Sequence, residues 1–484
     1  MAWKFYGRNQ ELEQLDQILD RERWAFVKIS GRRRIGKTTL IEETLKRHPD
    51  RRSFYVQIPD SEPAGVLEAV HGFMEAFELT QTKPNSLLEF AQLISELVEA
   101  GYIVVLDEFQ YFHRKVLEEF QSFLQSVVDR CSSRASQVKG CLIVLGSIHA
   151  EMTALLDDRR APLFNRLTDR LDLGHLDIGS VLEILRAHAQ GTPQELLFYW
   201  NLFEGVPKFY RDCYEQDVLG KDRAIVLRRM FFESSSPLRN EAENWFLHEL
   251  RGRYNMVLKF IAQKPGCVNG DIEARLRELD PARHKQAGGY LKILMDNYQM
   301  VERRLPIFAK PNARSGRYYI SDNFLRSWLH ALAIPAATIR FKPINDLIAQ
   351  ADRRLQDAEG YGLERLTASI YEERGRKGLP GFTLSSRIEG FWDKGGVEID
   401  LIALNEESRI IRFGSCKRDP GKHTIGELGR FDGHIERFLD AFPKYRHWTM
   451  EKTAITTEHT TATMKATLDA GYISEDLVAL TNGL

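Results

Sequence analysis

Short apolar runs alternate with amphipathic segments along the first 150 residues of the chain. The runs cover residues 24–30, 102–106 and 141–145 and are rich in residues that favour strands. The segments 40–45 and 87–98 repeat apolar residues at helical spacing. Strands that alternate with helices predict an α/β domain built on a parallel sheet.

The pattern changes in the region from about residue 245 to 330. It predicts two helices at 254–262 and 271–279, followed by a loop with Pro281 and Gly288-Gly289. A third helix is expected at 290–294 and two strands at 301–306 and 317–320. This order of elements is typical of a winged helix-turn-helix domain, in which the two strands form the wing.

A third pattern follows a hinge-like stretch at about 331–358. A helix is expected to begin at Gly362, and two strands are expected at 397–404 and 410–417. Apolar and acidic residues alternate in the first strand, so Glu398 and Asp400 share one of its faces.

A glycine-rich loop follows the first apolar run and precedes the first helical pattern. The loop fits GxxxxGK[ST] at every fixed position, and strand, loop and helix stand in the order the motif requires. The residues expected to bind ATP are Gly31, Arg32, Arg33, Arg34, Ile35, Gly36, Lys37, Thr38 and Thr39. Backbone amides would face the phosphates, Lys37 would reach the β- and γ-phosphates, and the Thr38 hydroxyl would hold Mg²⁺.

Two carboxylates end the second apolar run. Asp107 and Glu108 follow four apolar residues at the end of a predicted strand, the edge where open parallel sheets collect ligands. Asp107 would hold the Mg²⁺ shell, and Glu108 would orient and activate the attacking water.

Three other candidates each have an alternative. Ser147 follows the third strand and would lie beside the γ-phosphate, or it is an ordinary residue of a strand-to-loop turn. Arg166 and, less so, Arg170 would complete the ATP site of a neighbouring copy, or they form structural ion pairs. Gly205-Val206-Pro207 resembles the GxP turn of a small lid domain, which makes Pro207 a nucleotide-contact candidate.

The two C-terminal strands carry a second candidate site. Asp400 on one strand and Lys417 on the other resemble the Asp…Glu-x-Lys core of PD-(D/E)XK nucleases, which gather Mg²⁺ and an attacking water. Ser415 stands where the second acid belongs, and a hydroxyl binds Mg²⁺ more weakly than a carboxylate. Glu398 would take over as a metal ligand, or Glu364 would supply a carboxylate from a helix, or the site is inactive and the domain binds DNA or docks a partner.

Composition narrows the class of protein. The chain of 484 residues has 43% hydrophobic and 28% charged residues, which is typical of a soluble protein with about three domains. No apolar run reaches the roughly 20 residues of a membrane span, and no signal core is visible, so we expect a cytoplasmic protein without membrane partners. The five cysteines lack CxxC spacing, which argues against disulfides and zinc.

A net charge of −1 leaves any contact with DNA to local basic patches. One patch lies near the third predicted helix of the winged helix-turn-helix and the other lies on its wing. The patch near the helix contains Arg283, His284, Lys285 and Lys292. The patch on the wing contains Arg303, Arg304, Lys310, Arg314 and Arg317. They would contact phosphates, or the domain is a packing module that clamps the lid.

Nearly the whole chain resembles the archaeal-type ATPase family, which joins an AAA+-like P-loop core to a winged helix and a PD-(D/E)XK-like domain. The resemblance rests on the glycine loop, on Leu106-Asp107-Glu108-Phe109-Gln110, and on Glu398 to Asp400 with Lys417. It implies a P-loop core at 1–175, a helical lid at 176–240, a winged helix at 241–330, a linker at 331–358 and a nuclease-like domain at 359–484.

Two functions follow from the sequence. In the first, an ATPase controls DNA binding and metal-dependent DNA cleavage by its C-terminal domain. In the second, an ATP-dependent signalling switch uses an inactive nuclease-like domain to dock a protein partner or another copy of itself.

Overall fold

The computed structural model describes residues 2–147, 149–242, 253–279 and 286–484. The chain forms two compact units. Lys4–Leu176 and Val206–Lys208 make one, called here the core unit. Met1–Trp3, Asp177–Gly205 and Phe209–Leu484 make the other, called the larger unit.

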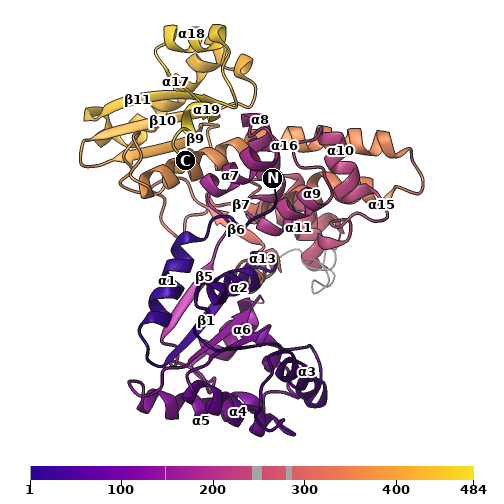
Figure 1. Ribbon diagram of the computed structural model, residues 1–484. Helices are drawn as coiled ribbons and strands as arrows, with labels where there is room; N and C mark the ends of the chain where they lie inside the picture. The colour runs from indigo at the N-terminus through magenta and orange to yellow at the C-terminus, as the bar shows by residue number, and fades with distance from the viewer. Residues whose placement is uncertain (1, 148, 243–252, 280–285) are drawn as a thin grey trace. The chain divides into compact units, whose positions relative to one another are not determined.

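The core unit is built on a five-stranded sheet in the order β2-β3-β4-β1-β5, and every pair of neighbours is parallel. The strands are β1 Ala25–Gly31, β2 Ser53–Gln57, β3 Ile103–Asp107, β4 Cys141–Gly146 and β5 Asp169–Leu173. The helices are α1 Asn9–Asp20, α2 Lys37–Arg47, α3 Pro63–Ala76, α4 Leu87–Glu99, η1 Phe109–His113, α5 Glu119–Ser133 and α6 His149–Leu156 (Figure 1).

The three predicted strands of this unit are confirmed as β1, β3 and β4, each within about one residue of its expected bounds. Their residues are almost all buried, because helices cover a parallel sheet on both faces. This explains why the sequence shows continuous apolar runs here instead of alternation. The α/β class with a parallel central sheet is therefore confirmed.

The larger unit begins with helices and a two-stranded antiparallel sheet of β6 and β7. Its first elements are α7 Ile178–His188, α8 Pro193–Phe203, α9 Pro207–Glu215, α10 Arg223–Leu227, η2 Arg228–Phe232, α11 Arg253–Gln263, α12 Asn269–Leu279, α13 Ala287–Asp296, β6 Val301–Arg304 and β7 Arg317–Ile320. The next are α14 Asn323–Ser327, η5 Trp328–Leu332, α15 Ala333–Ala337 and α16 Ile344–Arg376. The first residues of α9, Pro207 and Lys208, belong to the core unit.

A mixed sheet in the order β12-β11-β10-β9-β8 ends the larger unit (Figure 1). Strands β8, β9 and β10 pair antiparallel, whereas β10, β11 and β12 pair parallel. The elements are β8 Glu389–Trp392, β9 Glu398–Asn405, β10 Ile410–Cys416, η6 Pro420–Lys422, α17 Ile425–Ala441, η7 Pro443–His447, β11 Thr449–Thr456, α18 Thr461–Asp469, β12 Ile473–Asp476 and α19 Leu477–Leu480. Phe413, Phe438 and Tyr445 lie in the core beneath this sheet.

Two expectations about glycines are wrong. Gly288-Gly289 lies inside α13, not in a loop, and Gly362 lies in the middle of α16, which begins at Ile344. A Cβ at Gly362 would lie 2.4 Å from Oδ1 of Asn201, so glycine lets α16 pack closely on α8. Since α16 is continuous, the boundary expected between residues 358 and 359 falls within one helix.

Pro281 and the basic residues Arg283, His284 and Lys285 lie outside the described residues. Within the described part of the chain, no helix combines the length and the apolar character needed to cross a bilayer.

Candidate functional site

The glycine loop joins β1 to α2 at the edge of the core sheet. Gly31 has φ 153°, and a Cβ there would lie 2.7 Å from the carbonyl oxygen of Leu173 on β5. Gly36 has φ 93° and precedes the first residue of α2. Both positions need glycine, because side chains disfavour positive φ and Gly31 approaches another backbone closely. The free amides at the start of α2 thus face the loop.

Lys37 is 7% exposed, and its ammonium group is folded back onto the loop. Its Nζ donates to the carbonyl oxygens of Gly31 at 2.8 Å and Arg32 at 3.1 Å. Burial lowers the pKa of Lys37 to about 8, although Glu108 and Asp107 oppose the shift. Phosphate oxygens could replace the two carbonyls as acceptors for this ammonium group.

Thr38 and Asp107 meet although 69 positions separate them in the sequence. The Thr38 hydroxyl donates to Oδ2 of Asp107 at 2.7 Å. Tyr55, on the neighbouring strand β2, donates its hydroxyl to the same oxygen at 2.8 Å. Burial, followed by the charge of Asp107, raises the pKa of Tyr55, so the phenol stays a donor. No local sequence pattern marks Tyr55, because its role depends on the pairing of β2 with β3.

Glu108 is held at the end of β3 in a left-handed conformation, with φ 54°. Its carboxylate accepts hydrogen bonds from Ser147 Oγ at 3.0 Å and from Gln110 Nε2 at 2.5 Å. Gln110 in turn accepts from the backbone N–H of Ser147 at 3.2 Å. Ser147 therefore lies beside the candidate general base, and Gln110 is a further residue that orients it.

Arg8 and Pro207 approach the glycine loop from opposite ends of the core unit's sequence. Arg8 Nη2 donates to the carbonyl oxygens of Ile35 at 3.2 Å and Gly174 at 2.6 Å. A Cβ at Gly36 would lie 3.6 Å from Cγ of Pro207. The predicted contact residue Pro207 is thus next to the loop, whereas Arg33 and Thr39 are exposed.

Residues 5–209 match the sequence model of a family described as an ATPase domain predominantly from Archaea. This protein is an ATPase. The uncharacterized protein MJECL04 of Methanocaldococcus jannaschii is 26% identical over 423 residues, which cover 85% of this chain and 87% of the relative.

Two solved structures resemble the ATPase, each at 17% identity. The Walker-type ATPase PABY2304 of Pyrococcus abyssi has a TM-score of 0.51, and the match covers 67% of this chain and 96% of that one. The ORC2 protein of Aeropyrum pernix, in ADPNP-ADP complexes, has a TM-score of 0.48, with coverage of 74% and 97%. At this identity, the likeness to PABY2304 concerns the fold.

Both arginine-finger candidates of the ATPase form ion pairs within the core unit. Arg166 donates to both carboxylate oxygens of Asp129, at 2.7 and 3.0 Å. Arg170 pairs with Asp157, which also binds Lys28 at 2.6 Å. This geometry favours the structural alternative for both arginines.

The C-terminal candidates surround a cavity of about 160 Å³ between β9, β10 and α17. Asp400, Ser415 and Lys417 line it, as the shared strand faces predict. Oδ2 of Asp400 accepts a hydrogen bond from the backbone N–H of Cys416 at 2.8 Å. His423 is 6% exposed and also lines the cavity, where burial lowers its pKa to about 4. No local sequence pattern marks His423, because only the fold brings the start of α17 to this cavity.

Glu364 approaches the same carboxylates from α16. Burial raises the pKa of Glu364 well above its ordinary value, and Asp400 and Glu398 add to the shift. Burial also raises the pKa of Asp400. Two of the predicted acids, Glu364 and Asp400, line one cavity of about 360 Å³ where α16 packs beside β9.

Glu398 is engaged by the hairpin of β6, β7 and residues 305–316 between them. This hairpin covers the segment that the sequence predicts to be a wing, and it is called the wing below. The Glu398 carboxylate forms an ion pair with Arg317 of β7. The wing also bonds to β8, through Ile307 N–H to Gly390 at 2.9 Å and through Trp392 Nε1–H to Ser315 at 2.9 Å. The wing thus packs on the C-terminal sheet.

Three of the five basic wing residues are already engaged. Arg304 pairs with Glu302, Arg317 pairs with Glu398, and Arg303 donates to the backbone of Pro311 and Ala313. Lys310 and Arg314 remain exposed, as does Lys292 on α13.

Among the described residues, no group of three or more His, Cys, Asp or Glu side chains is arranged to hold a metal ion. Around Asp400, Glu398 is paired with Arg317 and Ser415 offers only a hydroxyl, so this donor set does not fit a Mg²⁺ centre. The Thr38 hydroxyl and Asp107 carboxylate do fit one, because P-loop ATPases hold Mg²⁺ with this pair and with the nucleotide's own oxygens.

Proposed function

We propose that Lys37, Thr38, Asp107 and Glu108 bind and hydrolyse Mg²⁺-ATP. The 2.7 Å contact between Thr38 and Asp107 carries the proposal, since it joins the glycine loop to the acidic end of β3. Mg²⁺ would supply charge neutralisation at the transferred phosphate. Lys37 would exchange its loop carbonyls for phosphate oxygens, and Glu108 would accept a proton from the attacking water.

Steady-state ATP turnover tests this assignment. Lys37→Ala and Glu108→Gln should each lower kcat by about 10²–10⁴-fold, the usual range for loss of a positioned general base or charge. Glu108→Gln should still bind ATP, whereas Lys37→Ala should bind it weakly. Glu96→Gln on the exposed face of α4 is the matched control and should behave as wild type. Normal turnover by Glu108→Gln would remove Glu108 from the mechanism.

We further propose that the ATPase is a switch acting on a C-terminal domain that docks a partner. In this proposal α7 to α10 form a lid and α11 to β7 form a winged helix-turn-helix. The segment from α16 to β12 forms a PD-(D/E)XK-like domain. The order α16-β8-β9-β10-α17-β11, with Asp400 on β9 and Lys417 just after β10, supports the last assignment. The pairing of Glu398 with Arg317, together with Ser415, favours docking over cleavage.

DNA binding with metal-dependent cleavage is the second candidate. Glu398 and Ser415 leave the donor set around Asp400 short of a Mg²⁺ centre, so cleavage would need Glu364, which lines the same cavity as Asp400, as a further ligand. A plasmid-cleavage assay with Mg²⁺ or Mn²⁺ separates the two functions. Cleavage that disappears in Asp400→Ala and Lys417→Ala would overturn the docking proposal. If the wild type is inactive but Ser415→Glu cleaves, the native site is attenuated by its serine.

A further inference from the structure

Helix α16 contacts the chain at both points where the segment 177–205 meets the core unit. The chain leaves the core unit after Leu176 and returns to it at Val206. Helix α7 begins directly after the first point and α8 ends just before the second. Two residues of α16, Glu373 and Arg365, are bonded to these two ends of the segment.

Glu373 caps the start of α7. It is 2% exposed, and its two carboxylate oxygens accept the backbone N–H groups of Ile178 at 2.6 Å and Gly179 at 3.0 Å. Lys377 adds an ion pair at 2.7 Å. The first amides of a helix have no partner within it and carry partial positive charge, so a buried carboxylate fixes the helix end firmly.

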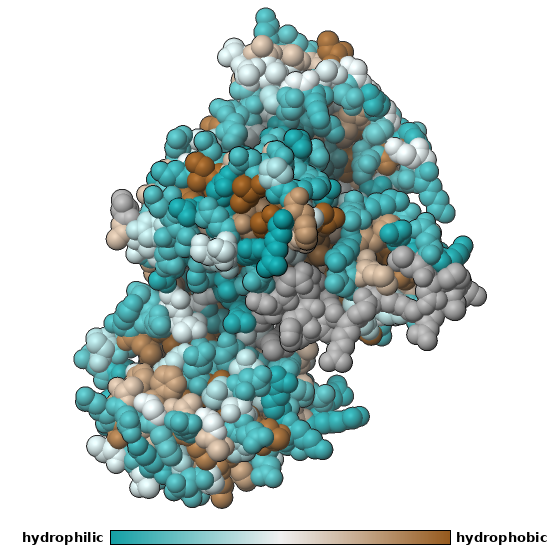
Figure 2. Space-filling model, turned by 90° about the vertical axis from the view of Figure 1, so that its right-hand side faces the viewer, coloured by the Kyte–Doolittle hydropathy of each residue, from teal (hydrophilic) through white to brown (hydrophobic). Residues whose placement is uncertain are grey.

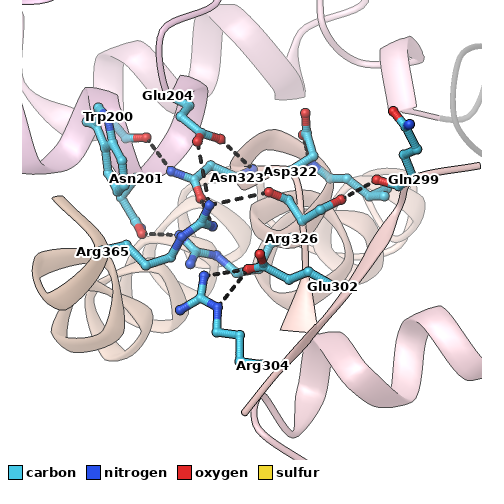
Figure 3. Close-up of polar contacts among 12 residues, drawn as sticks. Trp200, Asn201, Glu204, Gln299, Glu302, Arg304, Asp322, Asn323, Arg326 and Arg365 are labelled. Carbon is cyan, nitrogen blue, oxygen red and sulfur yellow. Dashed lines mark hydrogen bonds and ion pairs between the residues drawn. The ribbon is translucent and has the colours of Figure 1, made fainter. Parts of the chain in front are cut away.

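Arg365 holds the end of α8. Its Nη2 lies 3.5 Å from the carboxylate of Glu204, and its Nη1 donates to the Asn323 side chain at 2.7 Å. Asn323 donates in turn to the carbonyl oxygen of Trp200 on α8 at 2.9 Å. Figure 3 shows these groups converging, with Glu204 joined to both Arg365 and Asn323.

Glu204 has an unusual backbone conformation, with φ 52° and ψ −128°. A residue other than glycine stays in this region only when its surroundings hold it there. Three residues later, Pro207 lies beside Gly36 of the glycine loop. The backbone conformation of Glu204, which leads into Pro207, is therefore held next to Arg365.

The other side of α16 reaches the C-terminal sheet. Glu364, the neighbour of Arg365, lines a cavity together with Asp400 on β9. Tyr371 accepts a hydrogen bond from Arg412 of β10 at 2.9 Å and bonds to Glu475 of β12. One helix thus joins the ends of the segment 177–205 to the strands that carry the second candidate site.

We infer that α16 couples the nucleotide site to the C-terminal sheet, with Arg365 and Glu373 as positioning residues for both. The inference rests on the proposed ATP-driven switch and identifies α16 as the element that moves in it. The two anchors are eight residues apart, about 12 Å along the helix. Because Arg365 and Glu373 bond α16 to both ends of the segment 177–205, a change in the backbone direction of residues 204–207 moves α16. This movement carries Glu364 with it and shifts β9.

Hydrogen exchange on the full chain tests the coupling, with and without a non-hydrolysable ATP analogue and Mg²⁺. In the wild type, the analogue should change protection of β9, β10 and α17. Arg365→Met and Glu373→Gln should reduce this change at least threefold, although neither residue lies in the nucleotide site. Glu372→Gln and Arg376→Met, also on α16, are matched controls and should keep the full change.

The possible results decide between the claims. If the analogue does not change hydrogen-exchange protection of the C-terminal sheet in the wild type, the proposed switch is overturned. A wild type that responds, with equal responses in Arg365→Met and Glu373→Gln, overturns the inference and leaves the switch intact. If Arg365→Met does not fold, Arg365→Lys and Glu204→Gln replace it. Arg365→Lys keeps the charge but loses the forked contact, so it should give an intermediate response.

Discussion

At the scale of single residues, the candidate ATP site consists of groups that hold one another in place. Lys37 is bonded to loop carbonyls, Thr38 and Tyr55 donate to Asp107, and Ser147 donates to Glu108. Each of these polar groups is oriented before any ligand arrives. Such preorganisation lowers the cost of stabilising charge during the reaction.

The depressed pKa of Lys37 makes ATP binding depend on pH. In the free protein burial lowers this pKa to about 8, and bound phosphates should raise it again. Binding should therefore take up protons above about pH 8, and affinity should fall as the pH rises from 8 toward 10. Calorimetry in buffers of different ionisation enthalpy measures this uptake. Lys37→Met should show none, and a wild type without uptake at pH 8.5 would contradict the prediction.

Tyr55→Phe removes one of the two hydroxyl donors to Oδ2 of Asp107. A hydrogen bond to a charged group is worth about 1.5–3 kcal/mol, and Thr38 should retain part of the orientation. We expect kcat/KM for ATP to fall about three- to tenfold, or ~1 kcal/mol. Steady-state kinetics measures the loss. Tyr102→Phe, before the other end of β3, should leave the kinetics unchanged.

At the scale of elements, close packing of α16 on α8 depends on a residue without a side chain. Gly362 faces Asn201, whose side-chain oxygen accepts a hydrogen bond from Arg326 at 2.5 Å. Arg326 is buried, and desolvation lowers its pKa to about 10. Asn201 therefore takes part both in the close contact of α8 with α16 and in the hydrogen bonding of the buried Arg326.

Gly362→Ala and Gly360→Ala form a matched pair on α16. An added Cβ at 362 displaces Asn201 and should destabilise the larger unit by about 1–3 kcal/mol, the usual cost of overpacking. At 360 the Cβ meets nothing within 4 Å, so the substitution should stabilise the helix by about 0.5–1 kcal/mol. Urea unfolding measures both changes. Equal effects of the two substitutions would contradict close packing at Gly362.

At the scale of the whole molecule, the two compact units predict two unfolding events. Saturation with Mg²⁺-ATP analogue at 100 times Kd should stabilise the core unit by about 2.7 kcal/mol, because the ligand binds only folded protein. Differential scanning calorimetry should show one of two transitions moving to higher temperature. Lys37→Ala should abolish the movement. A single transition that does not respond to the analogue would contradict the prediction.

The net charge of −1 and the engaged wing arginines predict weak binding to DNA. If Lys310 and Arg314 contact phosphates, Lys310→Ala/Arg314→Ala should make the slope of log K against log salt shallower by up to about 2. Fluorescence anisotropy with duplex DNA at several salt concentrations measures the slope. An unchanged slope would show that Lys310 and Arg314 do not contact DNA phosphates. Lys259→Ala on α11 serves as the control.

Local patterns in the sequence were sufficient for the parallel α/β core and its glycine loop. Strand, loop and helix are neighbours in the chain there, and burial on both faces leaves continuous apolar runs. The local pattern also placed Asp400 and Lys417 on two successive predicted strands. Alternation along each strand then sets which of its side chains share a face of the sheet.

Only the tertiary structure decided which distant groups meet. Tyr55 reaches Asp107 through strand pairing, and Arg317 reaches Glu398 through the packing of the wing on the C-terminal sheet. The glycine at 362 permits a close helix contact where the local pattern predicted a helix start. These outcomes depend on contacts between residues far apart in the chain, and periodicity along one segment carries no information about its partners.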